Sequence, residues 1–526
     1  MALISDPTTE DRTVTIELPT ARSVLTNPSQ AELRTLVADM PNAVRTVFGN
    51  YNVTTNVTAR SAGSTFVIAD DGAHLSKPTM DRASYAEQVA RQEAHIADAD
   101  MLLVEGYIGP SGSPLRRPAR VFMERTHANI PAMQTQLYYP RDAAWRAEDA
   151  LTVVYTPNLS APGFPGEKLV TIDLDAWVTR VFGIDYFGES KMGGLRMWME
   201  WAFQQGSLPM HAGAKVIPTS SGVQLGLIIG LSGTGKTTTT FTRQNGSLPV
   251  QDDIVAITEG GQAHATENGC FAKTYGLDPD DEPTIHGALT RPESWLENVA
   301  IGPDGVVDFF DDSYTANGRG TFPLSMIEHS DPAQLGTADF LLILNANETI
   351  APAVAKMPSI AHAVAYFMLG ETKGTSAGGA EEAGKSLRVP GTNPFFMGHE
   401  AEQGVRLAAL LETMPDFEVF VLNTGRIGGS PEVSGSKKVK IPHTSAVVKA
   451  IAEGTISWQT DPDFGYLVAS DVPDFDDPEL LNPRALYGRL GRLAEYEEVV
   501  AGLKAARVAF LEGHRGLPGE VIDAVR

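Results

Sequence analysis

The chain has 526 residues, with 41 lysines and arginines against 65 aspartates and glutamates, so its formal net charge at pH 7 is −24. This acidic balance argues against a general nucleic-acid binder, because contacts to phosphates need clustered basic side chains. The single cysteine, Cys270, excludes an intramolecular disulfide and a cysteine-rich zinc site, and it is consistent with a reducing compartment.

Nothing in the hydropathy pattern predicts a membrane protein. Residues 1–13 are polar and lack the apolar core of a secretory signal. The most apolar stretches, 223–231 and 340–346, are far below the ~18 residues that a membrane span needs. We therefore expect a cytoplasmic protein that is not embedded in a membrane.

The first two hundred residues predict a mixture of strands and helices. A strand is expected at 64–71, a surface helix at 85–98, a strand at 150–155 and a helix at 193–205. From about residue 206 the pattern changes to apolar or β-branched runs bounded by Gly, Pro and Asp. These runs, at 223–231, 254–257, 339–344 and 417–422, predict central strands of a sheet covered on both faces.

Two features follow in the last third of the chain. Residues 370–394 contain six glycines, and a loop of this length inside a compact domain is usually functional or disordered. Near the end, an apolar stripe follows helical spacing and predicts core packing rather than a partner site. The stripe consists of Leu486, Leu490, Leu493, Val500 and Leu503.

One motif carries a specific chemical meaning. The strand expected at 223–231 leads into residues 230–237, which match GxxxxGK[ST] in full. We call residues 230–237 the phosphate loop. The glycines let successive backbone N–H groups point at phosphate oxygens, and the following helix adds its positive end. Lys236 would reach the β- and γ-phosphates, and the Thr237 hydroxyl would ligate a metal ion. The alternative is a glycine-rich turn without a ligand.

Two carboxylates stand beside the next strand-like run. Asp252 and Asp253 precede Ile254, and a hard divalent cation bound to nucleotide needs oxygen ligands of this kind. Taken alone, such a pair is more often a solvated turn. Its position after the phosphate loop favours a metal-binding role.

The loop at 230–238 reads GLSGTGKTT and resembles the kinase loop of the ATP-dependent phosphoenolpyruvate carboxykinases. Further segments are similar to motifs of that family in the same order, from about residue 57 to 445. The kinase loop and the segment 296–299, which reads LENV, are the most specific. The other similar segments are 58–61 (TGRS in the family), Met210 with His211, Asp252 with Asp253, 268–274 (GGCYAKT), 317–323 (NTRxxYP) and 422–425 (LNTG).

The resemblance implies an α/β fold with two domains. A mixed α/β N-terminal domain would cover residues 1–205, and a C-terminal P-loop-containing mononucleotide-binding domain of the carboxykinase type would cover 206–526. The active site would lie in the cleft between them, with a mobile lid at about 370–394 that excludes water from a reactive enolate.

The resemblance also implies the reaction. With ATP, Mg²⁺ and Mn²⁺, the enzyme would decarboxylate and phosphorylate oxaloacetate to phosphoenolpyruvate, ADP and CO₂. Its partners would be these small molecules and the nucleotide, with neither nucleic acid nor membrane. Two alternatives remain open: a related phosphotransferase that acts on a different carboxylate or enolate, and a nucleotide-binding pseudo-enzyme.

Residue roles follow from the same resemblance. The residues expected to be catalytic are Arg60, Lys191, Ser232, Lys236 and Arg319. Those expected to bind substrate are Arg60, Tyr186, Lys191 and Arg319. Those expected to bind nucleotide are Gly230, Leu231, Ser232, Gly233, Thr234, Gly235, Lys236, Thr237, Thr238, Lys273 and Lys438. Those expected to bind metal are His211, Thr237, Asp252 and Asp253.

The chain departs from the family pattern at three places. In a gapless register to His211, Lys191 takes the position of the first of two adjacent family lysines, and Met192 replaces the second, which ligates Mn²⁺. A thioether is a poor Mn²⁺ ligand, so either Lys191 or water completes the metal shell, or the metal or substrate differs. Lys438 stands where the family has an arginine near the adenine. Residues 374–379 do not resemble the lid of well-known members, so we place the chain in a divergent branch.

Overall fold

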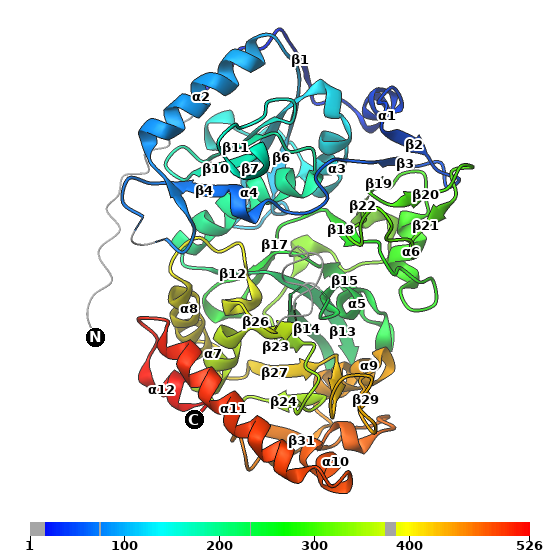
Figure 1. Cartoon of the computed structure of the whole chain (residues 1–526), viewed down its shortest axis with the longest axis vertical. Coiled ribbons are helices and arrows are strands. Elements are labelled where there is room, and N and C mark those ends of the chain that lie inside the picture. Colours follow the sequence, from blue (N-terminus) through cyan, green and yellow to red (C-terminus); the bar gives the residue numbers. More distant parts are fainter. Residues whose placement is uncertain (1–15, 73–74, 232, 374–385) are drawn as a thin grey trace.

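The computed structural model describes residues 16–72, 75–231, 233–373 and 386–526. Strands and helices are interspersed along the chain, and helices lie beside several sheets (Figure 1). The predicted α/β class is therefore confirmed. Ser232 and residues 374–385 of the expected lid lie outside the described residues.

The N-terminal part of the chain forms one large sheet, shown in blue to cyan-green in the upper half of Figure 1. Within the described residues its strand order is β1-β6-β7-β9-β11-β10-β4-β5, and β8 pairs with β6. The strands predicted at 64–71 and 150–155 are confirmed as β4 and β9. The strands are β1 (Ser23–Thr26), β4 (Thr65–Ile68), β5 (Thr79–Met80), β6 (Asp100–Ile108), β7 (Arg117–Glu124), β8 (Tyr139–Pro140), β9 (Leu151–Thr156), β10 (Leu169–Asp173) and β11 (Val178–Phe182).

Four helices accompany this sheet within the described residues. The surface helix predicted at 85–98 is confirmed as α2, which begins after Asp81, whose side chain accepts a hydrogen bond from the Ser84 N–H. The helix predicted at 193–205 is also present, but it begins earlier, at Phe187, so that Lys191 and Met192 are helical. The helices are α1 (Gln30–Ala38), α2 (Arg82–Ala97), α3 (Asn129–Leu137) and α4 (Phe187–Gln204).

A second large sheet carries the phosphate loop. Its order is β15-β13-β14-β23-β27-β24-β31-β30 among the described residues, and β14, β23 and β27 run parallel. Successive residues of β14 and β23 enter different hydrophobic clusters, which confirms that these strands are covered on both faces. The strands are β13 (Ala212–Thr219), β14 (Gly222–Ile229), β15 (Leu248–Gln251), β23 (Phe340–Asn345), β24 (Val354–Lys356), β27 (Glu418–Asn423), β30 (Ser457–Thr460) and β31 (Leu467–Asp471).

A third sheet joins distant parts of the sequence. Its order is β18-β22-β19-β3-β2 within the described chain, so residues 51–53 pair with residues 295–297. Lys273 pairs with Arg319, and Arg319 pairs with Glu297, across this sheet. The strands are β2 (Ala43–Arg45), β3 (Tyr51–Val53), β18 (Gly269–Lys273), β19 (Trp295–Glu297) and β22 (Arg319–Pro323).

Two expectations need correction. The run at 254–257 is not part of the phosphate-loop sheet, because β16 (Val255–Ile257) pairs antiparallel with β12 (Leu208–Met210) and β17 (Ala263–Ala265). Most of the C-terminal stripe packs in the core as predicted, with Leu486 and Leu490 in one hydrophobic cluster and Val500 and Leu503 in another, but the stripe is not one continuous helical face. The chain turns at Gly491, with φ +70°, between α10 and α11, and Leu493 is 39% exposed.

Helices α7 to α12 lie in the lower half of Figure 1, whereas α6, β20 and β21 lie beside β22. No helix among the described residues combines the length and apolarity that crossing a membrane requires. The remaining helices are α5 (Lys236–Phe241), α6 (Pro283–Leu289), α7 (Ile360–Leu369), α8 (Glu400–Glu412), α9 (Ile441–Glu453), α10 (Pro483–Arg489), α11 (Leu493–Glu512) and α12 (Gly519–Asp523). Among the described residues, three short antiparallel strand pairs join β20 (Ala300–Ile301) with β21 (Val307–Asp308), β25 (Glu371–Lys373) with β26 (Ser386–Arg388), and β28 (Arg426–Ile427) with β29 (Lys437–Lys438).

Candidate active site

The phosphate loop connects the end of β14 to the start of α5. Gly233 and Gly235 have φ values of +86° and +84°, a backbone conformation that favours glycine. Thr234 closes the turn through its backbone N–H and its hydroxyl, which donate to the Leu231 carbonyl oxygen at 3.1 and 2.8 Å. Thr424, which follows β27, donates its hydroxyl to the Thr234 carbonyl oxygen at 2.8 Å. The loop is thus held by the segment that follows β27, two strands away from β14 in the sheet.

The two threonines at the start of α5 contact acidic side chains. Thr237 donates its hydroxyl to Asp252 Oδ2 at 2.9 Å, as expected if both serve one cation. Thr238 donates its hydroxyl to Glu282 Oε1 at 2.6 Å. Cys270 is buried, and its thiol lies 3.4 Å from Asp252 Oδ1.

Asp253 is the centre of a cluster of charged side chains. Its Oδ1 lies 3.0 Å from His211 Nε2 and 3.6 Å from Lys236 Nζ, and its Oδ2 contacts Lys191 Nζ. Lys191 also lies 3.2 Å from Glu267 Oε2. Burial lowers the pKa of Lys236 to about 7. Three cationic or imidazole side chains from separate segments therefore meet at the Asp253 carboxylate.

The surroundings of His211 favour the neutral form of its imidazole ring. Burial, with the nearby Lys236 charge, lowers the pKa of His211 well below its ordinary value. Its Nδ1 lies 3.1 Å from the Thr392 carbonyl oxygen, which leaves Nε2 directed at Asp253. Phe395 packs edge-on against the imidazole, with ring centroids 5.4 Å apart.

These donors suit a cation that is shared with a bound nucleotide. A neutral imidazole and carboxylates are ligands for Mn²⁺ or Mg²⁺. No group of three or more His, Cys, Asp or Glu side chains in the described parts of the chain has metal-binding spacing. A cation here would therefore need phosphate, water or hydroxyl oxygens as well, which is how Mg²⁺ is usually held.

The residues expected to bind substrate lie on the third sheet and nearby segments. Arg319, the first residue of β22, donates Nη2 to Asn317 Oδ1 at 2.8 Å, and its guanidinium carbon is 5.2 Å from the Phe271 ring centroid. Tyr186 is buried, and this burial raises the pKa of its hydroxyl. The guanidinium carbon of Arg60 lies 5.7 Å from the Phe395 ring centroid.

One cavity of about 620 Å³ brings most of the predicted residues together. Arg60, Tyr186, Lys191, Met192 and His211 line it beside the loop residues Leu231, Gly233, Gly235, Lys236, Thr237 and Thr238. Asp252, Asp253, Lys273 and Arg319 complete the set of predicted residues in this lining.

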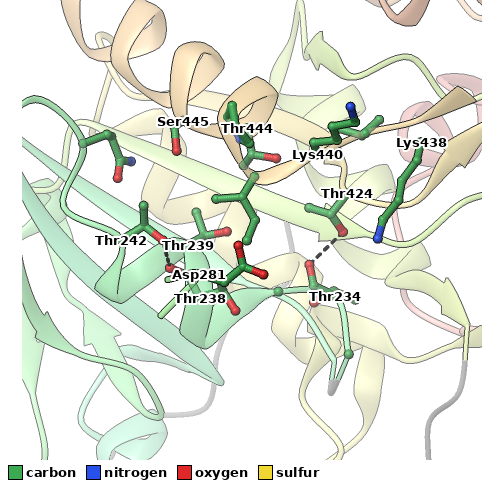
Figure 2. Close-up of a pocket in the computed structure, with 16 residues that line it drawn as sticks. Thr234, Thr238, Thr239, Thr242, Asp281, Thr424, Lys438, Lys440, Thr444 and Ser445 are labelled. Carbon is green, nitrogen blue, oxygen red and sulfur yellow. Dashed lines mark hydrogen bonds between the residues drawn. The ribbon is translucent and has the colours of Figure 1, made fainter. Parts of the chain in front are cut away.

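A second cavity, of about 520 Å³, lies between residues of α5 and α9 (Figure 2). Gly233, Thr234, Gly235 and Thr238 of the loop line it together with Lys438, so the structure separates Lys438 from the charged cluster. Hydroxyl groups and lysines make up much of this wall. The residues labelled in Figure 2 are Thr234, Thr238, Thr239, Thr242, Asp281, Thr424, Lys438, Lys440, Thr444 and Ser445.

Comparison with known proteins decides the family. Residues 22–478 match the family model described as phosphoenolpyruvate carboxykinase. The chain belongs to this family.

Curated relatives of this carboxykinase family member are named phosphoenolpyruvate carboxykinase (ATP). The chain is 32% identical to the phosphoenolpyruvate carboxykinase (ATP) of Aeropyrum pernix over 373 residues, which are 65% of this chain and 71% of the relative. It is 28% identical to phosphoenolpyruvate carboxykinase (ATP) 1 of Salinibacter ruber over 451 residues, 82% of each chain. It is also 28% identical to the phosphoenolpyruvate carboxykinase (ATP) of Rhizobium leguminosarum bv. trifolii over 545 aligned positions, 99% of this chain and 97% of the relative.

Lys191 and Met192, the two positions singled out by the expected register, lie next to each other in α4. Met192 lines the larger cavity and is 6% exposed. Its neighbour Lys191, one helical position earlier, is the side chain whose ammonium reaches Asp253. An amine thus stands beside His211 and Asp253, although the residue at position 192 is a methionine.

Several residues in or next to the larger cavity were not predicted from the sequence. Glu267, which contacts Lys191, directly precedes the segment similar to GGCYAKT, so the motif stopped one residue short of it. Phe395, beside His211, follows the last residue of the glycine-rich stretch. Lys77 and Phe510 also line the larger cavity, and no motif marked either of them.

Proposed function

We propose that the protein is an ATP-dependent phosphoenolpyruvate carboxykinase that converts oxaloacetate and ATP to phosphoenolpyruvate, CO₂ and ADP. One structural observation supports this activity for the present member of the carboxykinase family. A single cavity joins the phosphate loop to a cluster of cations, two aspartates and a neutral histidine. This combination meets the electrostatic needs of phosphoryl transfer to an enolate oxygen.

Arg60 and Tyr186 would orient oxaloacetate. The C3–C4 bond breaks, its electron pair forms the C2 enolate, and the C4 carboxylate leaves as CO₂. The enolate oxygen then attacks the γ-phosphorus of ATP, and the bond to the β-phosphate oxygen breaks to release ADP. Lys236 and Arg319, both in the cavity wall, would carry the negative charge on the phosphoryl group as it moves.

Metal ions fit the remaining donors. His211 and Asp253 would hold one cation, while Thr237 and Asp252 would hold the cation that accompanies ATP. Bound metal would supply positive charge at the enolate oxygen and the phosphates. The chain's own contribution is to keep the His211 imidazole neutral and oriented through the Thr392 carbonyl.

We further propose that the adenosine part of ATP occupies the smaller cavity. Gly233, Gly235 and Thr238 line both cavities, so a nucleotide whose phosphates lie on the loop can extend into either. The smaller cavity has few buried charges, which suits a neutral base and ribose. The domain division near residue 205 also remains a proposal.

The decisive experiment is an assay of the purified protein. With oxaloacetate, ATP, Mg²⁺ and Mn²⁺ we expect phosphoenolpyruvate and ADP in equal amounts, with no product when ATP is omitted. Lys236→Met serves as the matched negative control. ATP binding without phosphoenolpyruvate formation would contradict the proposal, and turnover of a different carboxylic acid would identify another substrate.

A further inference from the structure

Lys215 is a buried lysine next to α5, the helix that follows the phosphate loop. It lies on β13, the strand next to β14 in the large sheet, and it is completely buried. No carboxylate in the described parts of the chain lies within ion-pair distance of its ammonium. A buried ammonium is costly unless its N–H groups are hydrogen-bonded.

All three N–H groups of the Lys215 ammonium find acceptors at the end of α5. Nζ donates to the Thr239 carbonyl oxygen at 2.6 Å, to the Thr242 carbonyl oxygen, and to Gln244 Oε1 at 3.0 Å. The last carbonyl groups of a helix have no partner within the helix. Burial lowers the pKa of Lys215 to about 7, while the carbonyl oxygens around it favour the ammonium form.

The same face of β13 brings α5 close to the sheet. Gly213 precedes Lys215 by two residues, so both lie on one side of the strand. A Cβ atom at Gly213 would meet the Thr240 hydroxyl oxygen at 2.1 Å. The strand thus lets the helix approach at Gly213 and binds its far end through Lys215.

The helix held in this way is short, and it carries the proposed phosphate-binding groups at its other end. Helix α5 contains six residues and begins with Lys236 and Thr237, so the two ends are only ~9 Å apart. The Thr240 hydroxyl donates to the Lys236 carbonyl oxygen at 2.9 Å, which links the two ends directly.

We infer that Lys215 is a positioning residue for the phosphate loop: by binding the carboxyl end of α5 it fixes where Lys236 and Thr237 face the nucleotide. The inference rests on the proposed nucleotide-binding role of that loop. Removing the ammonium also leaves its oxygen acceptors unsatisfied, which lowers stability. ATP affinity measured on the folded variant separates a loss of positioning from this loss of stability.

The test is Lys215→Met in the full-length protein. Its matched control is Lys356→Met, which removes a lysine of β24 in the same sheet that pairs with Glu418 and does not contact α5. We expect Lys215→Met to weaken ATP binding about tenfold by calorimetry and to lower kcat, with KM for oxaloacetate changed less than about twofold. Lys356→Met should match the wild type in all three.

A second variant covers the case in which Lys215→Met does not fold. Lys215→Gln retains an N–H donor, and we expect its ATP affinity to lie between those of Lys215→Met and the wild type. Wild-type ATP affinity in Lys215→Met, or an equal loss in Lys356→Met, would overturn the inference, as would failure of both Lys215 variants to fold. If the wild type itself binds no ATP, the proposed function fails instead.

Discussion

The two cavities beside the phosphate loop differ in what their walls are made of. In the smaller cavity, hydroxyl groups bond to backbone oxygens, as Thr424 does to Thr234 and Thr242 does to Thr238 (Figure 2). In the larger cavity, ionisable groups contact one another around Asp253. Removing a neutral hydroxyl or an exposed charge costs little, whereas removing one of several buried charges leaves its partners uncompensated. Substitutions in the larger cavity should therefore have the larger effects.

The largest effect is expected at Lys236. Lys236→Ala should lower phosphoenolpyruvate formation by about 100-fold or more, because this side chain would neutralise charge on the phosphoryl group in the transition state. The steady-state rate measures this, and circular dichroism checks that the fold is retained. Activity above about a tenth of the wild-type value would contradict the assigned role.

The two arginines should separate binding from chemistry. Arg60→Ala should mainly raise KM for oxaloacetate, since its proposed partner is a carboxylate of the bound substrate. Arg319→Ala should mainly lower kcat, since it would contact the phosphoryl group as charge moves; we expect about tenfold to 100-fold for each. Initial-rate kinetics at varied oxaloacetate distinguishes the two, and equal effects on KM alone would remove the distinction.

Position 192 should affect metal affinity to a smaller degree. Met192→Lys adds a second amine to the cavity, and we expect Mn²⁺ to bind several-fold more tightly, because each ligand and its orientation contribute to affinity. Lys191→Met is the opposite change and should weaken Mn²⁺ binding, since Lys191 contacts Asp253. Mn²⁺ titrations followed by paramagnetic resonance test both. Identical curves for Met192→Lys and the wild type would leave Lys191 as the relevant amine.

The smaller cavity should give a weaker response. Lys438 is exposed and lies in the wall of that cavity alone. Lys438→Ala should raise KM for ATP about twofold to fivefold without changing kcat, because exposed charges contribute little free energy. A fall in kcat as large as that of Arg319→Ala would show that the two cavities do not differ in the way proposed.

Glu297 is the last residue of β19 and pairs with Arg319, which lines the larger cavity. Its burial should make the free energy of unfolding depend on pH. Its side chain is fully buried, Oε1 accepts the Phe187 N–H at 2.9 Å, and burial raises its pKa to about 8. Between the ordinary value of 4.5 and about 8 the folded state holds a proton that the unfolded state has lost. Stability should therefore fall as pH rises through this range, by at most ~1.4 kcal/mol per pH unit.

Glu297→Gln should remove this decline, because the amide does not titrate. Urea unfolding of both proteins at pH 5, 6, 7 and 8 measures the slope. An unchanged slope in Glu297→Gln would show that Glu297 is ionised in the folded protein.

The sequence alone determined the features that are local in the chain. A strand, a glycine-rich turn and a lysine are contiguous at 223–237, and their spacing predicts the loop without reference to the rest of the chain. The strands at 339–344 and 417–422 were also predictable, because burial on both faces requires continuous apolar runs. The resemblance of short segments then supplied the family, which the comparison confirmed over residues 22–478.

Only the tertiary structure decided how distant segments meet. The apolar run at 254–257 predicts a strand of the large sheet. The pairing partners of a strand depend on the topology of the fold, which the hydrophobic periodicity of the sequence does not contain. Position in α4 directs the Lys191 ammonium to Asp253, and residue spacing gave no sign of its second contact with Glu267. Nothing in the sequence distinguishes Lys215 from a surface lysine on a strand. Its role arises because the chain folds the end of α5 over it, and contacts of this kind are set by packing between elements rather than by local pattern.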